Sequence, residues 1–296
     1  MKIIANRKIW FIFSGALVGL SLIALAVWGL KPGIDFTGGS LLELQFTGTP
    51  PGSFELVELV RAKGLETPEV QTSGTHNVVL RFIPVTEQQH QELVSALKEK
   101  YPEMQEVRFD SIGPSVGREL FQKALMAIVL VTIMILLYIA WSFRKVSRPV
   151  PAWVYGVIVI IAFLHDVAIP LGLFSYLGHF RGWEVGSPFI AAVLTILGYS
   201  ISDTIVVLDR VRENLKKVKG TFEEIVEVSV HQTVTRSINT SVTTMLALLA
   251  IFIFGGSTLQ VFSLALLVGI FFGTYSSIFI AAPLLVTWYR LRGGRR

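Results

Sequence analysis

Cysteine is absent from this 296-residue sequence, and only 16% of the residues are charged. Without thiols the chain forms no disulfide and no thiolate metal site, and its redox compartment is left open. Soluble proteins usually contain about 25% charged residues. Here the missing charges are concentrated in long gaps, because three stretches of twenty or more residues contain no Asp, Glu, Lys or Arg. Gaps of this length are typical of membrane-spanning helices.

The motifs of enzymes and of bound cofactors are also missing. The sequence contains no nucleotide-binding motif, no recognisable pair of nucleophile and base, and no cluster of metal ligands. We therefore expect a protein that is not an enzyme and that binds neither a cofactor nor a metal.

The first charge gap predicts a membrane-spanning helix near the N-terminus. Residues 9–30 carry no charge, and a helix of this length crosses the roughly 30 Å of hydrocarbon in a bilayer. A secretory signal has an apolar core of only about 7–15 residues, so residues 10–30 are interpreted as a retained helix. Cleavage near the small-residue motif Ala24-Leu-Ala26 is the alternative.

Four further charge-poor regions predict five more spanning helices, which gives six in total. The last region, 237–289, is too long for one helix and fits two helices joined by a turn at Gly255-Gly-Ser-Thr258. The other three regions are 124–143, 149–178 (interrupted by His165 and Asp166) and 185–208 (interrupted by Asp203).

The distribution of basic residues predicts the orientation of these helices. Sixteen Lys and Arg fall at the two termini and in two of the short connections. They are Lys2, Arg7, Lys8, Arg144, Lys145, Arg148, Arg210, Arg212, Lys216, Lys217, Lys219, Arg236, Arg290, Arg292, Arg295 and Arg296. The opposite connections, 177–187 and 255–258, contain only Arg181. We therefore expect both termini in the cytoplasm. The net charge of +5 then reports topology, and nucleic acid is not an expected partner.

Residues 31–118 have the composition of a soluble domain and are expected outside the cytoplasm. Their periodicity predicts strands and helices in the order β-α-β-β-α-β, which is that of ferredoxin-like domains. The expected elements are a strand at 41–47, a helix at 53–64 with Ser53 as N-cap, strands at 69–75 and 77–83 that turn near Ser73-Gly74, a helix at 86–100, and a strand at 105–112. This domain is expected to be a binding module or a structural module.

The predicted organisation is therefore an α-helical membrane protein with six transmembrane helices and one small α+β ferredoxin-like domain. Residues 1–30 hold the N-terminus and the first helix, and residues 31–118 form the extracytoplasmic domain. Residues 119–296 hold the other five helices, with a cytoplasmic basic loop at 209–235. A capping box at Thr221-Phe-Glu-Glu224 predicts an amphipathic helix that leads into the fifth spanning helix.

Two carboxylates interrupt the apolar helices, and such residues usually face a bundle interior and serve ion pathways. Asp166 is expected near mid-bilayer, four residues before Pro170, which cannot donate to the Asp166 carbonyl group. His165 either relays protons or bonds a neighbouring helix, and it is expected to point about 100° away from Asp166. Asp203 is expected on the cytoplasmic side of the bilayer centre, and a position in the headgroup layer is the alternative.

Arg236 opens the fifth helix, and its long side chain can reach inward towards Asp203. An Asp–Arg pair would hold the carboxylate ionised, and withdrawal of the Arg would let it take up a proton. The alternative role of Arg236 is that of a topology anchor.

Small and hydroxylated side chains mark the last two helices. The fifth helix has a high density of hydroxyl groups, including Thr240, which either line a wet path or form helix–helix hydrogen bonds. In the sixth, Gly269, Gly273 and Ser277 form a stripe for close helix packing.

Several motifs occur in order along almost the whole chain. They are Gly33-Ile-Asp-Phe-Thr-Gly-Gly39, Leu164-His-Asp-Val167, Gly198-Tyr-Ser-Ile-Ser-Asp203 with Asp209-Arg-Val-Arg-Glu-Asn214, Gly255-Gly256, Gly273-Thr-Tyr-Ser-Ser277 and Ala281-Ala-Pro283. Together they resemble the SecF-type members of the SecD/SecF family of bacterial membrane proteins. The sequence departs from the usual family pattern at Ser202, where Asn is usual.

The resemblance implies one half of an export machine similar to resistance-nodulation-division transporters, in the bacterial inner membrane. SecD would be the other half, and the pair would act with the SecYEG channel on unfolded precursor proteins. The proton motive force would drive the outward pull, with protons as the coupling ion and the lipid bilayer as the surroundings. Asp203 and Arg236 match the family's proton-path pair, and Asp166 matches a second membrane carboxylate.

Two other functions are compatible with the helices and carboxylates. One is half of a small-molecule efflux transporter of related architecture, although that class usually carries twelve helices and larger outside domains in one chain. The other is a non-transporting scaffold, in which the polar residues Asp166, Asp203 and Arg236 would only hold the helices together.

Overall fold

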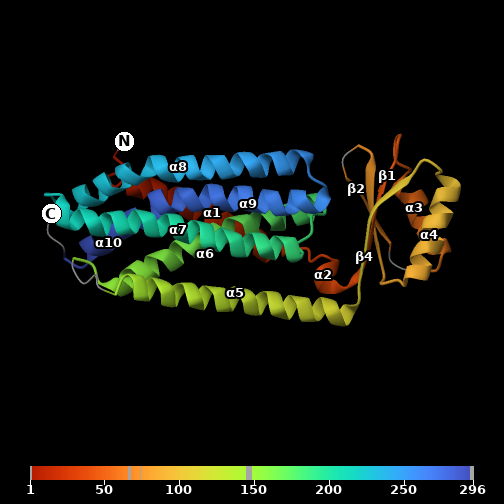
Figure 1. The fold of residues 1–296 in the computed structure, drawn as a ribbon, viewed down its shortest axis with the longest axis horizontal. Coiled ribbons are helices and arrows are strands. Elements are labelled where there is room, and N and C mark those ends of the chain that lie inside the picture. Colours follow the sequence, from red (N-terminus) through yellow and green to blue (C-terminus); the bar gives the residue numbers. More distant parts are fainter. Residues whose placement is uncertain (1, 66–67, 74, 145–148, 294–296) are drawn as a thin grey trace. The chain divides into compact units, whose positions relative to one another are not determined.

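The computed structural model describes residues 2–65, 68–73, 75–144 and 149–293. The chain divides into two compact units (Figure 1). The helical unit contains Met1–Leu30, Ala127–Trp183 and Pro188–Arg296, and the small unit contains Lys31–Met126 and Glu184–Ser187. The predicted turn at Gly74 and four of the basic residues, Lys145, Arg148, Arg295 and Arg296, lie outside the described residues.

The small unit contains a four-stranded antiparallel sheet. Its strands are β1 (Gly39–Gln45), β2 (Glu69–Ser73), β3 (Asn77–Phe82) and β4 (Gln105–Ile112), in the spatial order β2-β3-β1-β4. Each predicted strand is found within two residues of its expected ends. In β1, Leu42 faces Leu80 of β3 on one side and Phe109 of β4 on the other, so the apolar pattern of the central strand fixes the register.

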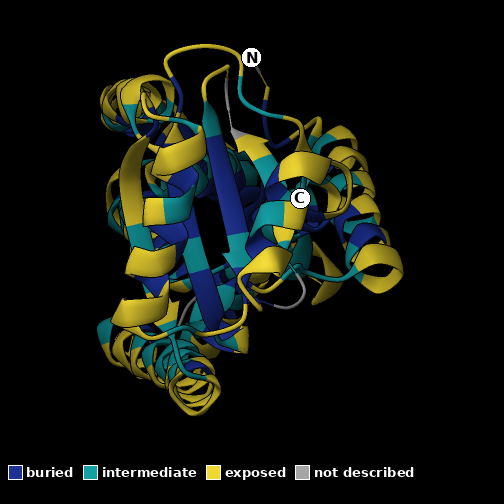
Figure 2. Cartoon of the chain, turned by 90° about the vertical axis from the view of Figure 1, so that its right-hand side faces the viewer, coloured by how far each residue is buried: buried dark blue, intermediate teal, exposed yellow. Residues whose placement is uncertain are grey.

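Two helices supply the rest of the apolar core of this unit. They are α3 (Ser53–Ala62) and α4 (Glu87–Lys100), which bury Leu56 and Leu93 against the sheet residues Leu42 and Leu80. Figure 2 shows the buried residues along the strands and the exposed residues on the outer faces of the helices.

The starts of the two helices differ in their capping. α4 begins after Thr86, which forms a capping box with Gln89. The expected N-cap of α3 is wrong by one residue, because Gly52 takes the N-cap conformation and Ser53 is the first helical residue, without a side-chain cap.

The segment 184–187 belongs to the small unit although it connects two long helices. Val185 donates its N–H to the carbonyl oxygen of Lys31 over 2.8 Å and accepts from the N–H of Gly33 over 2.9 Å. Glu184 forms ion pairs with Arg81 of β3 (2.9 Å) and with Lys31 (3.5 Å). The connection is therefore held by both backbone and charged contacts.

A short helix, α2 (Ile34–Thr37), follows this contact and was not predicted from the sequence. Its Asp35 accepts a hydrogen bond of 2.6 Å from the N–H of Ser187, which is the first residue of the long helix that follows residues 184–186. Gly38 and Gly39 follow with φ of 77° and 139°, where side chains are strained. A Cβ on Gly38 would lie 2.7 Å from the Cα of Pro114, so only glycine fits this turn.

Among the residues that the structure describes, six helices are long and apolar enough to cross a membrane, as predicted. They are α1 (Arg7–Trp28), α5 (Pro114–Ser142), α6 (Ala152–Arg181), α7 (Ser187–Lys217), α8 (Phe222–Phe254) and a sixth composed of α9 (Ser257–Ser276), the π-helical turn η1 (Ser277–Ala281) and α10 (Ala282–Leu291).

The core of the helical unit lies between α6, α7 and the sixth helix. Its fully buried members include Tyr155 of α6, Leu197 of α7 and Leu285 of α10. By contrast α5, at the bottom of Figure 1, exposes large apolar side chains such as Met126, Leu137 and Trp141. An exposed apolar surface of this kind suits lipid or another helix better than water.

The predicted basic loop at 209–235 is wrong, because only residues 218–221 separate α7 from α8. Charge gaps locate the end of the hydrocarbon layer, whereas a helix continues for as long as its exposed residues support it. Here α7 is supported by ion pairs one turn apart, Arg212 with Asp209 at 2.5 Å and Arg210 with Glu213 at 2.8 Å. The predicted amphipathic helix after Thr221 is likewise the first part of α8, and its capping box is present.

Candidate functional site

Asp166 of α6 is a fully buried carboxylate that connects three helices. Ser276 of α9 donates a hydrogen bond of 2.7 Å to Asp166 Oδ2, and Ser200 of α7 donates to the same oxygen. These two hydroxyl groups replace part of the hydration that a carboxylate loses on burial. Asp166 therefore joins α6, α7 and α9 at one point.

His165 lies beside this carboxylate, and the expectation that it points away is wrong. Its Nδ1 is 2.8 Å from Asp166 Oδ1. The imidazole ring is flanked by the aromatic rings of Phe272 and Tyr275, at centroid distances of 6.3 and 6.0 Å. This apolar surrounding leaves the carboxylate as the polar contact of the ring, since His165 Nε2 has no hydrogen-bond partner among the described residues.

Asp203 of α7 is half-buried and also accepts from serine hydroxyl groups of two other elements. Ser237 of α8 donates to Oδ1 and Ser277 of η1 donates to Oδ2, and each hydrogen bond is 2.5 Å long. Both oxygens of the carboxylate are thus occupied. Asp203 links α7 to α8 and to the π-helical turn.

The two carboxylates belong to one set of contacts. Ser200 and Asp203 are one turn apart on α7, and Ser276 and Ser277 are consecutive. We call the six residues the carboxylate–serine cluster: Asp166, Ser200, Asp203, Ser237, Ser276 and Ser277. Its members come from four of the six long helices.

Glycines let the sixth helix approach α7 next to this cluster. A Cβ on Gly273 would lie 3.0 Å from the Cβ of Ser200, and one on Gly269 would lie 2.2 Å from Cδ1 of Ile196. The predicted stripe of Gly269, Gly273 and Ser277 thus lies against α7. Ser277 does more than pack, because its hydroxyl group contacts Asp203.

A π-helical turn begins at Ser277. Such turns are rare, and they are often found at functional sites inside longer helices. Here the border between α9 and the turn η1 falls between Ser276, the last residue of α9, and Ser277, the first residue of η1. The change in helix geometry therefore falls between the donors to the two carboxylates.

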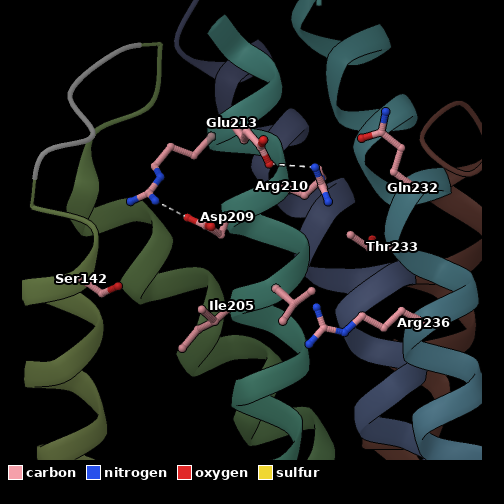
Figure 3. A pocket seen from close by; sticks show the side chains of 10 residues that line it. Ser142, Ile205, Asp209, Arg210, Glu213, Gln232, Thr233 and Arg236 are labelled. Carbon is pink, nitrogen blue, oxygen red and sulfur yellow. Dashed lines mark hydrogen bonds and ion pairs between the residues drawn. The ribbon is translucent and has the colours of Figure 1, made fainter. Parts of the chain in front are cut away.

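The predicted meeting of Asp203 and Arg236 is not found. Among the described residues no hydrogen bond or ion pair joins the two, and the exposed Arg236 forms no ion pair with any described residue. Its side chain extends from α8 towards Ile205 of α7 (Figure 3). The next residue, Ser237, is turned by about 100° around α8 and takes the place beside Asp203.

Arg236 lines a pocket of about 380 Å³ between α7 and α8 (Figure 3). The other lining residues are Ser142, Ile205, Val206, Asp209, Arg210, Arg212, Glu213, Gln232 and Thr233. Arg210 and Arg212 are paired with carboxylates of their own helix. Arg236 is thus the lining cation that has no ion pair within the described part of the chain.

The two remaining candidate residues lie outside these contacts. Ser202 is exposed on α7. Thr240 is exposed on α8 and donates to the carbonyl oxygen of Arg236, four residues earlier, over 2.7 Å. A second set of hydroxyl groups, Tyr199, Ser241 and Thr274, connects α7, α8 and α9.

Sequence reasoning missed Ser200 and Ser276 as partners of Asp166. The only signal was local: Ser200 precedes Asp203 by one turn, and Ser276 follows Gly273 by three residues. That spacing puts each serine on a helix face already singled out, but it does not say which carboxylate the face meets. The described residues contain no group of three or more potential metal ligands from His, Cys, Asp and Glu.

Family models match most of the chain. A model described as "Protein export membrane protein SecD/SecF, C-terminal" matches residues 92–291, and the "SecD/SecF GG Motif" matches residues 23–50. The second match contains the turn at Gly38 and Gly39.

Curated relatives agree over nearly the full length. The "Protein translocase subunit SecF" of Anaerolinea thermophila is 40% identical over 97% of this chain and 94% of its own length. That of Thermobaculum terrenum is 41% identical with the same coverage of both chains. These names describe a transport subunit, which agrees with the expectation of a protein that is not an enzyme.

Among solved structures, SecDF from Thermus thermophilus, described as a translocon-associated membrane protein, has a TM-score of 0.85 and 34% identity. The match covers 98% of this chain and 39% of that chain, so the present chain spans well under half of the SecDF polypeptide. The motifs, the six apolar helices and these matches agree. The chain is a multi-pass membrane protein and belongs to the SecD/SecF family of protein export membrane proteins.

Proposed function

We propose that this chain is a proton-motive-force-coupled subunit of Sec-dependent protein export. It would act with SecD as the other half of the machine and with the SecYEG channel, and it would help to pull or release unfolded precursors on the outer side. The observation that carries the proposal is the carboxylate–serine cluster, in which neither Asp166 nor Asp203 is paired with a Lys or Arg of the described residues, and the ring of His165 contacts Asp166.

The physical argument concerns the free energy of charge. A carboxylate inside a helical bundle is costly as an ion, and such groups commonly exchange protons in pumps and transporters. Each proton that crosses a potential of 100 mV releases about 2.3 kcal/mol. That free energy is enough to bias a two-state movement of the helices that carry Asp166 and Asp203.

The orientation of the helices is part of the proposal. Both termini and the α7–α8 connection would face the cytoplasm of a bacterial cell, with the protein in the inner membrane. Support comes from the basic residues at these places, including Lys8, Lys216, Lys217 and Arg290, because Lys and Arg favour the cytoplasmic side.

The small unit would then lie outside the cytoplasm and would be a ferredoxin-like domain. Its elements follow one another along the chain as β1, α3, β2, β3, α4 and β4, which is the order of that fold.

The test uses membrane vesicles with the channel, SecD and this chain, loaded with a secretory precursor halted during export. Release of the precursor is measured with and without a proton gradient, and in matched vesicles without this chain. The proposal expects a gradient-dependent fraction of release that requires this chain. Equal release in all four samples would overturn it, and efflux of a small molecule instead would favour a transporter of related architecture.

A further inference from the structure

Ser276 and Ser277 form the shortest covalent connection between the contacts of the two membrane carboxylates. Ser276 is fully buried at the end of α9 and donates to Asp166, and Ser277 is fully buried at the start of η1 and donates to Asp203. A single peptide bond therefore separates two hydroxyl groups whose acceptors lie on different helices.

We propose that Ser276 and Ser277 are positioning residues that couple Asp166 to Asp203, with the π-helical turn Ser277–Ala281 as the joint between them. This inference rests on the proposed function. A change in the protonation of one carboxylate alters its hydrogen bond to one serine. Because the next residue is bonded to the other carboxylate, the displacement passes directly to the second site.

A second chain of contacts, through Ser200 of α7, also connects Asp166 to Asp203. Asp166 is also bonded to Ser200, and Ser200 is one turn from Asp203 on α7. The two carboxylates are thus connected both through α7 and through the Ser276–Ser277 step. The connection through α7 runs along a continuous α-helix, whereas the other connection crosses the border between α9 and the π-helical turn.

The local geometry of the turn favours this role. An α-helix satisfies each carbonyl group four residues on, whereas a π-helix uses the fifth residue. A segment at the border of the two patterns can exchange one set of bonds for the other without leaving the helix. Ser277 also lies 2.9 Å from the carbonyl oxygen of Thr274, so its hydroxyl group has a backbone acceptor when it leaves Asp203.

Close packing keeps the joint against α7. Gly273, three residues before Ser276, lies against Ser200 with no space for a larger side chain unless Ser200 shifts. Phe279 within the turn packs on Trp10 of α1 at a centroid distance of 4.5 Å. A rearrangement of the turn would therefore be transmitted to α1 as well.

The same helix supplies a matched control. Ser263 of α9 is as deeply buried as Ser276, but within the described part of the chain its hydroxyl group donates to backbone carbonyl groups of its own helix, at Leu259 and Gln260. Ser263→Ala removes a buried hydroxyl group without touching a carboxylate. It reports the cost of the substitution itself.

The experiment is a double-substitution cycle in vesicles that contain SecD, the channel and the full chain. Ser276→Ala, Ser277→Ala, their combination and Ser263→Ala are compared for the rate of gradient-dependent precursor release. Each cluster variant should lower that rate about tenfold, as expected for a hydrogen bond to a charged group. The combination should be no slower than the slower single variant, since residues that act as a unit are not additive.

Rescue by a conservative variant separates positioning from folding. Ser277→Thr keeps the hydroxyl group and should keep most of the release rate, and recovery of each variant with SecD is measured to show that assembly is intact. If Ser277→Thr assembles poorly because of its extra methyl group, the release rates of Ser277→Ala and Ser263→Ala still show whether the Ser277 hydroxyl group matters for coupling.

The absence of cysteine allows a measurement that does not depend on the precursor. Phe279→Cys would be the only thiol in the chain, and its labelling rate is measured with and without an imposed proton gradient. The proposal expects a change of several-fold that disappears when Ser276→Ala or Ser277→Ala is added.

The outcomes are distinct for the two levels of the proposal. If the unaltered chain gives no gradient-dependent release, the proposed function fails. If it does, but the two alanine variants match Ser263→Ala, or their effects multiply, the coupling role is overturned. Gradient-independent labelling of Phe279→Cys would also contradict it.

Discussion

Arg236 and Ser237 are neighbours on α8, yet of these two it is Ser237 that donates a hydrogen bond to Asp203. The Ser237 hydroxyl group lies 2.5 Å from Asp203 Oδ1, whereas the Arg236 side chain lines a pocket beside Ile205. A rotation of α8 by about 100° would be needed to exchange the two side chains, because consecutive helical residues differ by that angle. In this conformation Ser237 therefore stabilises Asp203, whereas Arg236 would have to act in a different conformation.

The first prediction follows from that separation. Ser237→Ala leaves Asp203 with one hydroxyl donor fewer and should destabilise the protein by about 1–3 kcal/mol. Arg236→Met removes no ion pair found in this structure and should change stability by no more than about 0.5 kcal/mol, while gradient-dependent release falls. Thermal unfolding of both purified variants checks the order. A larger loss of stability for Arg236→Met would support the scaffold alternative.

The turn at Gly38 gives a prediction about stability alone. Gly38 and Gly64 have nearly the same φ, 77° and 76°, but a Cβ on Gly38 would meet Pro114, whereas one on Gly64 would meet none of the described residues within 4 Å. Gly64→Ala should therefore cost only the backbone strain, about 1–2 kcal/mol. Gly38→Ala should cost about 1–3 kcal/mol more, because the contact overfills the turn.

Denaturant unfolding of the full chain measures both glycine variants. The difference between them isolates the steric contact, since the backbone strain is common to both. Equal losses would show that the turn relaxes around the new methyl group, and the close packing of Gly38 on Pro114 would then not matter for stability.

A pH dependence is expected from Glu184, which lies between α6 and α7. Burial raises the pKa of Glu184, against the opposing attraction of Arg81 and Lys31. The folded state then binds its proton more tightly than the unfolded state. This contribution to stability is present below the ordinary pKa of the carboxyl group, 4.5, and falls as pH rises through the folded value.

Glu184→Gln should remove this dependence, so that the stability of the variant relative to the unaltered chain rises with pH above about 4.5. Glu69 supplies a control of opposite sign. A hydrogen bond from Lys31 lowers the pKa of Glu69, so Glu69→Gln should lose stability relative to the unaltered chain as pH rises, by a small amount because the side chain is largely exposed. Both expectations are tested by measuring the unfolding midpoints of the two variants and the unaltered chain between pH 4 and 8. Curves of midpoint against pH that run parallel for all three proteins would contradict the expected pKa shifts of Glu184 and Glu69.

The six helices could be predicted from the sequence because hydrocarbon excludes charge, and the gaps between charged residues locate the membrane core. The C-terminal end of α7 and the N-terminal end of α8 could not be predicted in this way, because ion pairs such as that of Arg212 with Asp209 let a helix continue beyond the apolar segment. The strands of the small unit were predictable from alternation, which gave β4 at 105–112 without error. The short helix α2 depends on contacts with residues 184–187, which lie far away in the sequence.

The site divides in a similar way. Asp166 and Asp203 stood out because a carboxylate in an apolar helix is costly wherever its partners are. Ser276 did not, because serine is common in membrane helices and its role depends on meeting α6 from 110 positions away. The π-helical turn has no signal of its own, since neither Pro nor Gly occurs within Ser277–Ala281.

The central claim is that Asp203 belongs to the coupling path, and the most direct measurement is gradient-dependent precursor release by Asp203→Asn. Asp209→Asn is the matched control, because Asp209 lies on the same helix but pairs with the half-buried Arg212. Recovery with SecD is checked first for both variants. The account predicts that Asp203→Asn assembles and releases precursor at the gradient-independent rate, while Asp209→Asn keeps its response. Full gradient dependence in assembled Asp203→Asn would contradict the account and leave Asp203 as a structural link between α7, α8 and η1.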